Sequence, residues 1–159
     1  MSQARAREAI CRVGASLFAR GYVHATAGNI SLRLDDETGG YLVTPTDACL
    51  GFLDPARLAH VGADGRRIAG DPPSKTIGLH MRIYAAARRF DANTSCVIHA
   101  HSTHCVALTL RAPAAELLPP ITPSVLEETA RLACLAREAP QPLGDAEIDE
   151  LRAAFGARW

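Results

Sequence analysis

Three of the six histidines in this 159-residue chain fall within six positions, in the stretch CVIHAHSTHC at 96–105. His99 and His101 follow an apolar run and are two residues apart, so on a strand both side chains leave the same face. This pattern favours a metal site over two residues that cap a buried strand and hydrogen-bond to the backbone. A catalytic zinc ion needs about three protein ligands. We therefore expect the remaining ligands from elsewhere in the chain or from a neighbouring subunit.

Three polar segments precede the histidines: TAGNIS at 26–31, TPTD at 44–47 and PPSK at 72–75. They combine Gly, Asn, Thr and Ser where strands are predicted to begin or end, and Ser74 and Lys75 fall at a predicted helix start. Backbone N–H groups and the dipole at a helix N-terminus attract anions, and a lysine adds a point charge. Each segment alone is typical of a turn or a cap. Taken together, they are as compatible with a small-molecule phosphate site as with ordinary turns.

The composition is that of a soluble globular protein, with 48% hydrophobic and 21% charged residues. Lys plus Arg and Asp plus Glu both number 17, so no basic field indicates a nucleic acid or an anionic membrane. The five cysteines are scattered and form no CxxC pair, which favours free thiols in a reducing compartment. We expect a single cytoplasmic domain at 1–159. The Arg-rich start also suits a transit peptide, but Glu8 and its helical periodicity favour a folded helix.

Hydrophobic periodicity predicts the elements that position these residues. A helix is expected over residues 3–20, with Gly21 as its stop and one apolar face made of Ala6, Ile10, Val13, Leu17 and Phe18. ISLRL and YLVTP form a hairpin around DDETGG, a Pro-initiated turn follows, and a second hairpin turns at Asp64-Gly65. Ser74 is the expected N-cap of a helix that carries Ile77, Met81, Tyr84 and Ala85 on one side.

The second half of the chain is predicted to be mainly helical. SCVIHAH reads as a short buried strand, and STHCVALTL as a helix with His104 in its first turn. AAELLPPITP is a linker, and two terminal helices follow in SVLEETARLACLARE and DAEIDELRAAFG. In the last helix Asp145 is the expected cap, Ile148, Leu151 and Phe155 face inward, and Gly156 is the stop. Helices at both ends of antiparallel strands predict an α/β layered domain.

Taken together, these motifs resemble the class II aldolase/adducin family in order and spacing. The resemblance rests on TAGNIS, TPT, PSK, His80 and VIHAHSTHCVAL. Within the family, PSK together with LGFLDP and LLPPIT resembles the motifs of the 3-oxo-tetronate 4-phosphate decarboxylases. Sugar-phosphate aldolases typically carry a second serine at the position that Lys75 occupies here. The resemblance implies a three-layer α/β/α fold with a mainly antiparallel central sheet, and a homotetramer with active sites at subunit interfaces. It also implies a divalent metal, usually zinc, that polarises a ketone or enediolate oxygen.

The resemblance also implies roles for individual residues. The phosphate of a sugar acid would be held by Thr26, Gly28, Asn29, Thr46, Ser74 and Lys75. The metal would be bound by His99 and His101. Loss of CO2 from a β-keto acid leaves an enolate, and a Lewis acid on its oxygen is what that chemistry requires.

The chain departs from the family pattern at three places. Thr76 stands where the family has a glutamate acting as acid/base, and Asp47 replaces a glycine, which puts negative charge beside the expected phosphate. Pro123 and Ser124 join what the family separates by several dozen residues, a segment that carries a strand pair and the third histidine ligand in an NHG motif. We therefore predict an internal deletion near 122–124 and a sheet that lacks some of its strands.

Several functions are compatible with these residues. The first is a metal-dependent lyase of the decarboxylase type, and the second a catalytically silent relative that keeps the fold for binding or assembly, as adducins do. A shortened gene product without a function is the third. A sugar-phosphate aldolase is a further alternative. Loss of the acid/base residue and of the third ligand favours the silent protein and the shortened product. Retention of the histidine pair and the polar loops favours the lyase.

Overall fold

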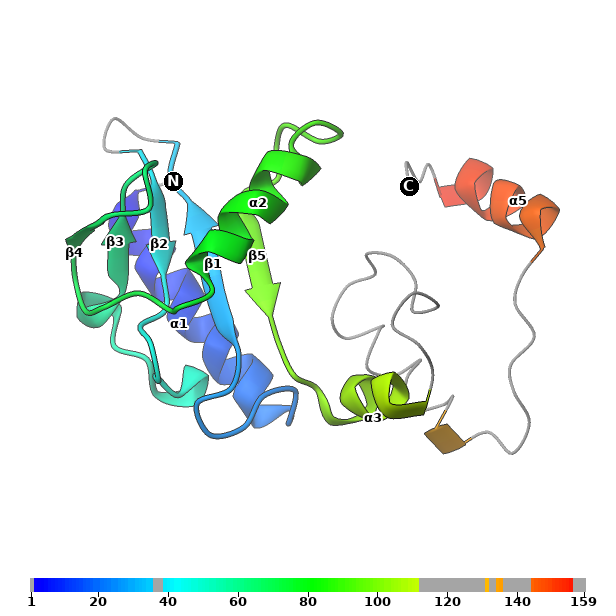
Figure 1. Cartoon of the computed structure of the whole chain (residues 1–159), viewed down its shortest axis with the longest axis horizontal. Coiled ribbons are helices and arrows are strands. Elements are labelled where there is room, and N and C mark those ends of the chain that lie inside the picture. Colours follow the sequence, from blue (N-terminus) through cyan, green and yellow to red (C-terminus); the bar gives the residue numbers. More distant parts are fainter. Residues whose placement is uncertain (1, 36–38, 112–130, 132–133, 136–143, 156–159) are drawn as a thin grey trace. The chain divides into compact units, whose positions relative to one another are not determined.

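The computed structural model describes residues 2–35, 39–111, 131, 134–135 and 144–155 (Figure 1). They fall into two compact units, Met1–His101 and Ser102–Trp159. The predicted linker at 114–123, the expected deletion at 122–124 and most of the predicted helix at 124–138 lie outside the described residues.

The first unit is built on an antiparallel sheet in the order β4-β3-β2-β1-β5. Its strands are β1 (Asn29–Arg33), β2 (Tyr41–Val43), β3 (Ala59–Val61), β4 (Arg67–Ala69) and β5 (Cys96–His99). Both predicted hairpins are confirmed, because β1 pairs with β2 and β3 with β4. β5 returns along the free edge of β1, and this pairing sets Asn29 opposite His99.

Helix α1 (Gln3–Ala19) covers one face of the sheet, as the periodicity predicts. Its buried residues Ala6, Ile10 and Leu17 share a core with Ile30 and Leu42 from the strands. Removing an aliphatic side chain of this size from water contributes about 1.5–3 kcal/mol. The expected stop at Gly21 is confirmed by its φ of 73°, a conformation that favours glycine.

Helix α2 (Ile77–Ala87) covers the other face, which gives the first unit its three α/β/α layers. Its Tyr84 ring stacks on Tyr41 of β2, with centroids 5.2 Å apart. The expected N-cap at Ser74 is wrong, because the helix begins after Thr76 and Ser74 lies two residues before that cap. Of the residues expected on one side of this helix, Tyr84 is buried, Ile77 and Met81 are half-buried and Ala85 is exposed.

Short irregular elements complete the first unit. The 3₁₀ turns η1 (Leu50–Phe52) and η2 (Pro55–Arg57) follow β2, and the Asp54 carboxylate accepts the Ala56 N–H at the start of η2. β5 is less buried than the sequence predicts: among the described strands it lies at the edge of the sheet, and Cys96 is exposed.

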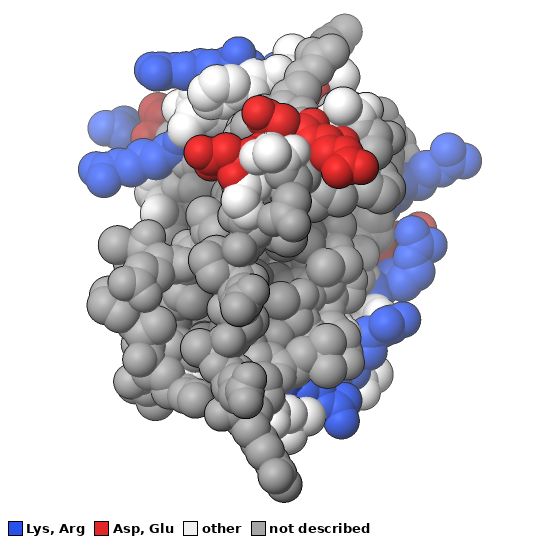
Figure 2. All heavy atoms as spheres, turned by 90° about the vertical axis from the view of Figure 1, so that its right-hand side faces the viewer, with Lys and Arg blue, Asp and Glu red and all other residues white. Residues whose placement is uncertain are grey.

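The second unit contains the predicted helices α3 (Thr103–Arg111), which holds His104 in its first turn, and α5 (Asp145–Phe155). Asp145 is the first residue of α5 and not its cap, because Ile148 N–H already donates to Gly144 O. The side chains of Leu151 and Phe155, and Gly156, lie outside the described part. Figure 2 shows acidic side chains gathered over α5, where Asp145, Asp149 and Glu150 are exposed. No helix in the described part is long and apolar enough to cross a membrane.

Candidate phosphate and histidine site

Backbone hydrogen bonds bring the three polar segments of the sequence together. Thr44 N–H donates to Ile30 O at 3.0 Å, and Ile30 N–H donates to Thr44 Oγ1 at 3.1 Å. Ser74 N–H donates to Thr44 O at 3.0 Å, and Thr46 N–H donates to Pro72 O at 2.9 Å. The start of β1, the segment after β2 and the segment before α2 therefore lie side by side and form one polar surface.

The end of β5 adds the histidine pair to this surface. The His99 and His101 rings have centroids 4.6 Å apart and are tilted by 47°. Gly28 lies against the same strand end: with its φ of 85°, a Cβ atom there would sit 2.8 Å from His99 O. Only glycine permits this close approach, so Gly28 sets the distance between the polar loop and His99.

A row of side-chain hydrogen bonds links the helix start to the histidine. Thr76 Oγ1 donates to Asn29 Oδ1 at 3.0 Å, and Asn29 Nδ2 lies 3.3 Å from His99 Nδ1. Ser74 Oγ is 3.0 Å from Thr76 Oγ1. Asn29 and Ser74 are nearly buried, with 7% and 8% of their surface exposed. The sequence suggested Asn29, Ser74 and His99 one by one, but not this continuous row through Thr76.

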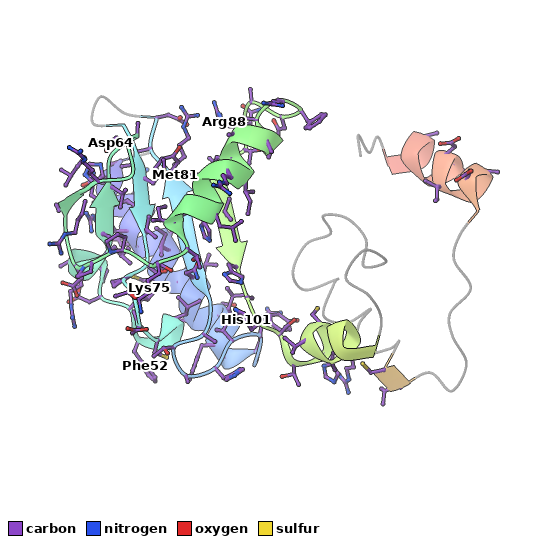
Figure 3. All side chains as sticks on the ribbon, viewed as in Figure 1. Phe52, Asp64, Lys75, Met81, Arg88 and His101 are labelled. Carbon is purple, nitrogen blue, oxygen red and sulfur yellow. The ribbon has the colours of Figure 1, made fainter. Side chains whose placement is uncertain are left out.

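The other predicted phosphate residues lie at the margin of the site. Thr26 is exposed in a turn closed by Ala27 N–H donating to His24 O at 2.9 Å. Thr46 is half-buried, and Lys75 is exposed. In Figure 3, Lys75 and His101 lie toward the same end of the sheet in that view, the end at which β5 runs out. The structure therefore joins Gly28, Asn29, Ser74 and His99 closely and places Thr26 and Lys75 in solvent.

Asp47 lies beside Thr46 in a left-handed backbone conformation, with a φ of 55°. The family's glycine at this position would adopt that conformation without strain. A hollow of about 420 Å³ opens here and is lined by Thr46, Asp47, Asp54, Phe52 and the Arg57–Asp71 ion pair, among others. The exposed carboxylate of Asp47 is consistent with the expectation of negative charge next to the phosphate loops.

A second polar cluster lies between α2 and β1, and the sequence did not predict it. His80 Nδ1 is 2.7 Å from Ser31 Oγ, and that oxygen is 2.9 Å from the Tyr84 hydroxyl. Tyr84 also donates to Ser31 O at 2.9 Å. His80 is fully buried, and its Nε2 has no hydrogen-bond partner within the described part of the chain. The sequence feature that could have indicated this cluster is the i, i+4 spacing of His80 and Tyr84, which places both side chains on one face of α2.

Burial shifts the acid–base equilibria of both clusters. It lowers the pKa of His80 to about 4, and the nearby His99 adds to this effect. Burial, and secondarily the charge of His101, lowers the pKa of His99. Burial raises the pKa of Tyr84. His80 and His99 are therefore neutral near pH 7, and a neutral imidazole is the form that can accept a proton or bind a metal.

The described residues fit a divalent metal in chemistry but not in number. His99 and His101 offer imidazole nitrogens, but no three His, Cys, Asp or Glu side chains of the described ranges converge on one point. His60 Nε2 forms a hydrogen bond with Gly39 O at 3.1 Å, and His24 is exposed in a loop. His104 lies in the second unit. Two ligands fall short of the three that a catalytic zinc site needs.

Residues 8–158 match the family described as class II aldolase and adducin N-terminal domain. The chain is 53% identical to the 3-oxo-tetronate 4-phosphate decarboxylase of Cupriavidus necator over 124 residues, which cover 77% of this chain and 54% of that protein. It is 38% identical to the enzyme of the same name from Pectobacterium atrosepticum over 160 residues, which cover 99% of this chain and 69% of that protein.

Solved structures show the same similarity. YgbL from Escherichia coli, described as an aldolase/epimerase/decarboxylase, superposes with a TM-score of 0.75 at 30% identity, covering 94% of this chain and 99% of that one. An L-fuculose 1-phosphate aldolase superposes with a TM-score of 0.74 at 18% identity, covering 95% and 96%, and supports the fold alone. The chain spans about half the length of several of the curated relatives that it matches. Its sequence and its fold agree, and the chain belongs to the class II aldolase and adducin family.

Proposed function

We propose that this chain is a lyase that acts on a phosphorylated sugar acid, in the manner of the 3-oxo-tetronate 4-phosphate decarboxylases that it resembles. The observation that carries the proposal is the meeting of three polar segments with the paired imidazoles of His99 and His101 at one end of the sheet. Relatives that share 53% and 38% of the aligned residues bear the decarboxylase name.

In this proposal the phosphate binds to the polar surface. The phosphate-binding residues are Thr26, Gly28, Asn29, Thr46, Ser74 and Lys75. Hydroxyl and amide groups supply neutral hydrogen bonds, and the exposed Lys75 ammonium supplies the charge. The Gly28 backbone comes close because it has no side chain to keep the ligand away.

Decarboxylation of a β-keto acid moves the electrons of the broken carbon–carbon bond onto the ketone, which becomes an enolate. Class II aldolases are generally dependent on a divalent metal, which acts as a Lewis acid on such an oxygen when bound. We propose that His99 and His101 are two of its ligands, that the ion is zinc, and that the third ligand comes from outside the described residues or from a neighbouring subunit of a homotetramer. The Thr76 hydroxyl donates to Asn29 and so positions that side chain. It does not act as the acid/base group, because a threonine hydroxyl does not exchange protons near pH 7 as a carboxylate does.

A cytoplasmic location is part of this proposal. None of the five cysteines forms a disulfide among the described residues, and burial raises the pKa of the Cys11 thiol. Thiols that remain reduced are typical of a reducing compartment.

A specific observation favours a second candidate, a catalytically silent binding protein. The hydroxyl of Thr76, at the position of the family's acid/base residue, is fully used within the row of hydrogen bonds to Asn29 and Ser74. A protein of this kind would bind the phosphorylated sugar acid and leave its carboxyl group in place.

Binding and turnover of a 3-oxo-tetronate 4-phosphate separate these candidates. The full chain is supplied with excess Zn²⁺, and calorimetry and CO2 release are measured together. The lyase proposal expects CO2 release that is lost in His99→Ala and retained in the matched exposed variant His24→Ala. Binding without CO2 release establishes the silent protein. Absence of binding in the wild type contradicts both candidates.

A further inference from the structure

Helix α2 has an outer side in addition to the side that buries His80 and Tyr84 against the sheet. On this outer side Leu79 and Ile83 remain 49% and 39% exposed, and Phe90, in the turn that ends the helix, is 78% exposed. Single exposed apolar side chains are common on soluble proteins, but these three recur at intervals of four and seven residues. Residues at that spacing follow one side of a helix, so they form a continuous apolar line, which we name the outer stripe.

Two arginines accompany the outer stripe. Arg82 and Arg89 are exposed and seven residues apart, which is about two helical turns, so both fall along the same flank. The residues of α2 include no Asp or Glu, and neither arginine forms an ion pair within the described ranges. Arg88 differs, because its Nη1 donates to Thr94 O at 3.1 Å. The outer side of α2 is therefore apolar and basic.

Helix α5 has the complementary composition. Ile148, Leu151 and Phe155 fall three and four residues apart, which places them on one face of the helix. The acidic residues of α5 outnumber its single arginine. Asp145 and Asp149 are exposed, and Figure 2 shows acidic side chains gathered over this helix. An apolar line with acidic neighbours is the chemistry that the outer stripe and its arginines would recognise.

The contrast of charge extends through the whole sequence. Residues 1–101 contain more Lys and Arg than Asp and Glu, residues 102–159 contain the reverse, and the two excesses cancel in the net charge of zero. Each copy of the chain therefore carries both halves of a complementary contact. Copies that both give and receive such a contact can close into a symmetric assembly, either as a reciprocal pair or as a ring.

We propose that the outer stripe of α2 is an assembly surface that receives α5 of a second copy of this chain. The apolar lines of the two helices pack against each other, and removal of this surface from water stabilises the contact. Arg82 and Arg89 lie opposite the acidic residues of α5 and set its orientation. The inference goes beyond the proposed function, because none of these residues belongs to the phosphate or histidine site.

The first test is the oligomeric state of the full chain, measured by sedimentation equilibrium over a range of protein concentrations. The wild type is expected to form assemblies whose mass is a multiple of 16.9 kDa, with weaker association at high salt. Ile83→Asp places a charge in the outer stripe and should weaken association by about 10-fold or more. Ile68→Asp is the matched control, because Ile68 is 60% exposed on β4, and it should associate like the wild type.

The second test identifies the occupant by exchange of charge. One variant carries Arg82→Glu with Arg89→Glu, and the other carries Asp145→Lys with Asp149→Lys. Each variant alone should associate at least about 10-fold more weakly than the wild type, because like charges then face each other at every contact. An equal mixture of the two should recover most of the wild-type affinity, because α2 and α5 of the two different variants again carry opposite charges.

Several results would overturn the proposal. A wild type that stays monomeric refutes it, and so does an assembly that persists unchanged in Ile83→Asp and in both charge variants. If the charge variants are weakened but their mixture recovers nothing, α5 is not the occupant in a second copy. Binding of a monomeric wild type to vesicles of anionic phospholipid, lost in Ile83→Asp, would assign the outer stripe to a membrane surface instead. Far-UV circular dichroism identifies a variant that does not fold. In that case the wild-type mass and the mixture, whose substitutions are all at exposed positions, decide the outcome.

Discussion

Protonation of His80 should destabilise the fold as the pH falls below neutrality. Burial is the main reason why the pKa of this imidazole drops from 6.5 to about 4, and the nearby His99 adds to the effect. Its Nδ1 is held by Ser31 at 2.7 Å, and its Nε2 has no partner within the described residues that could stabilise a charge. The perturbation that tests this is His80→Asn, which removes the titrating ring and retains an amide that can bond to Ser31.

The magnitude and the sign follow from linkage between folding and protonation. The unfolded chain takes up the proton near pH 6.5, and the folded chain does so only near pH 4. The stabilising effect is therefore complete above pH 6.5, declines as the pH falls and is gone below pH 4. At 1.36 kcal/mol per pH unit this amounts to about 3 kcal/mol in total, and to about 2 kcal/mol between pH 7 and pH 5.

The assay is urea unfolding of the full chain followed by far-UV circular dichroism at pH 7 and at pH 5. The wild type should lose about 2 kcal/mol more than His80→Asn between these pH values, because carboxylates and the other histidines contribute equally to both proteins. His24→Asn is the matched control, and its loss should equal that of the wild type because His24 is exposed. Equal losses in the wild type and in His80→Asn would show that burial of this imidazole does not resist protonation.

Three further changes test the site. Gly28→Ala should destabilise the fold by about 1–3 kcal/mol in urea unfolding, because its φ is 85° and the new Cβ would meet His99 O at 2.8 Å. Gly39→Ala is the control, since its φ is 58° but a Cβ atom added there meets no atom of the described residues within 4 Å. An equal cost in both variants would argue against a steric effect at Gly28. Asp47→Asn should tighten phosphate binding a few-fold at low salt and less at high salt, as measured by calorimetry, and unchanged affinity would exclude a role for its charge. Zinc should be lost on dialysis against a mild chelator if His99 and His101 are its only ligands, whereas stoichiometric retention measured by atomic absorption would require the third ligand of the proposed site to be supplied from outside the described residues or by a neighbouring subunit.

Local patterns were sufficient for most elements of the fold. The apolar spacing from Ala6 to Leu17 predicted α1, and Asp64-Gly65 predicted the turn between β3 and β4. These signals lie within a few residues of one another, so no distant contact is needed to interpret them. The start of α2 was misplaced because Ser74 has the character of a cap, but its backbone is engaged by Thr44 O across the sheet.

The residues of the site were identified from the sequence, but not their connections. The spacing of His99 and His101 and the polar segments with Asn29 and Ser74 indicated a phosphate and metal site, and the family they indicated is confirmed. Thr76 was interpreted only as the position of a missing carboxylate. Its hydrogen bond to Asn29, 47 residues away, could not be inferred from either residue alone.

The sequence by itself determined the family, the order of the elements and the chemical types at the site, because each depends on residue identity or short spacing. The tertiary structure decided which atoms meet. Asn29 reaches His99 across 70 residues because β1 and β5 pair in a register that sets them opposite each other, and Gly28 lets the loop approach the strand end. Burial of His80 was also a tertiary outcome, since α2 had to pack on β1 before its imidazole could lose contact with water. Hydrogen-bond direction and pKa depend on those distances and on the exclusion of water, and neither is encoded in any local run of residues.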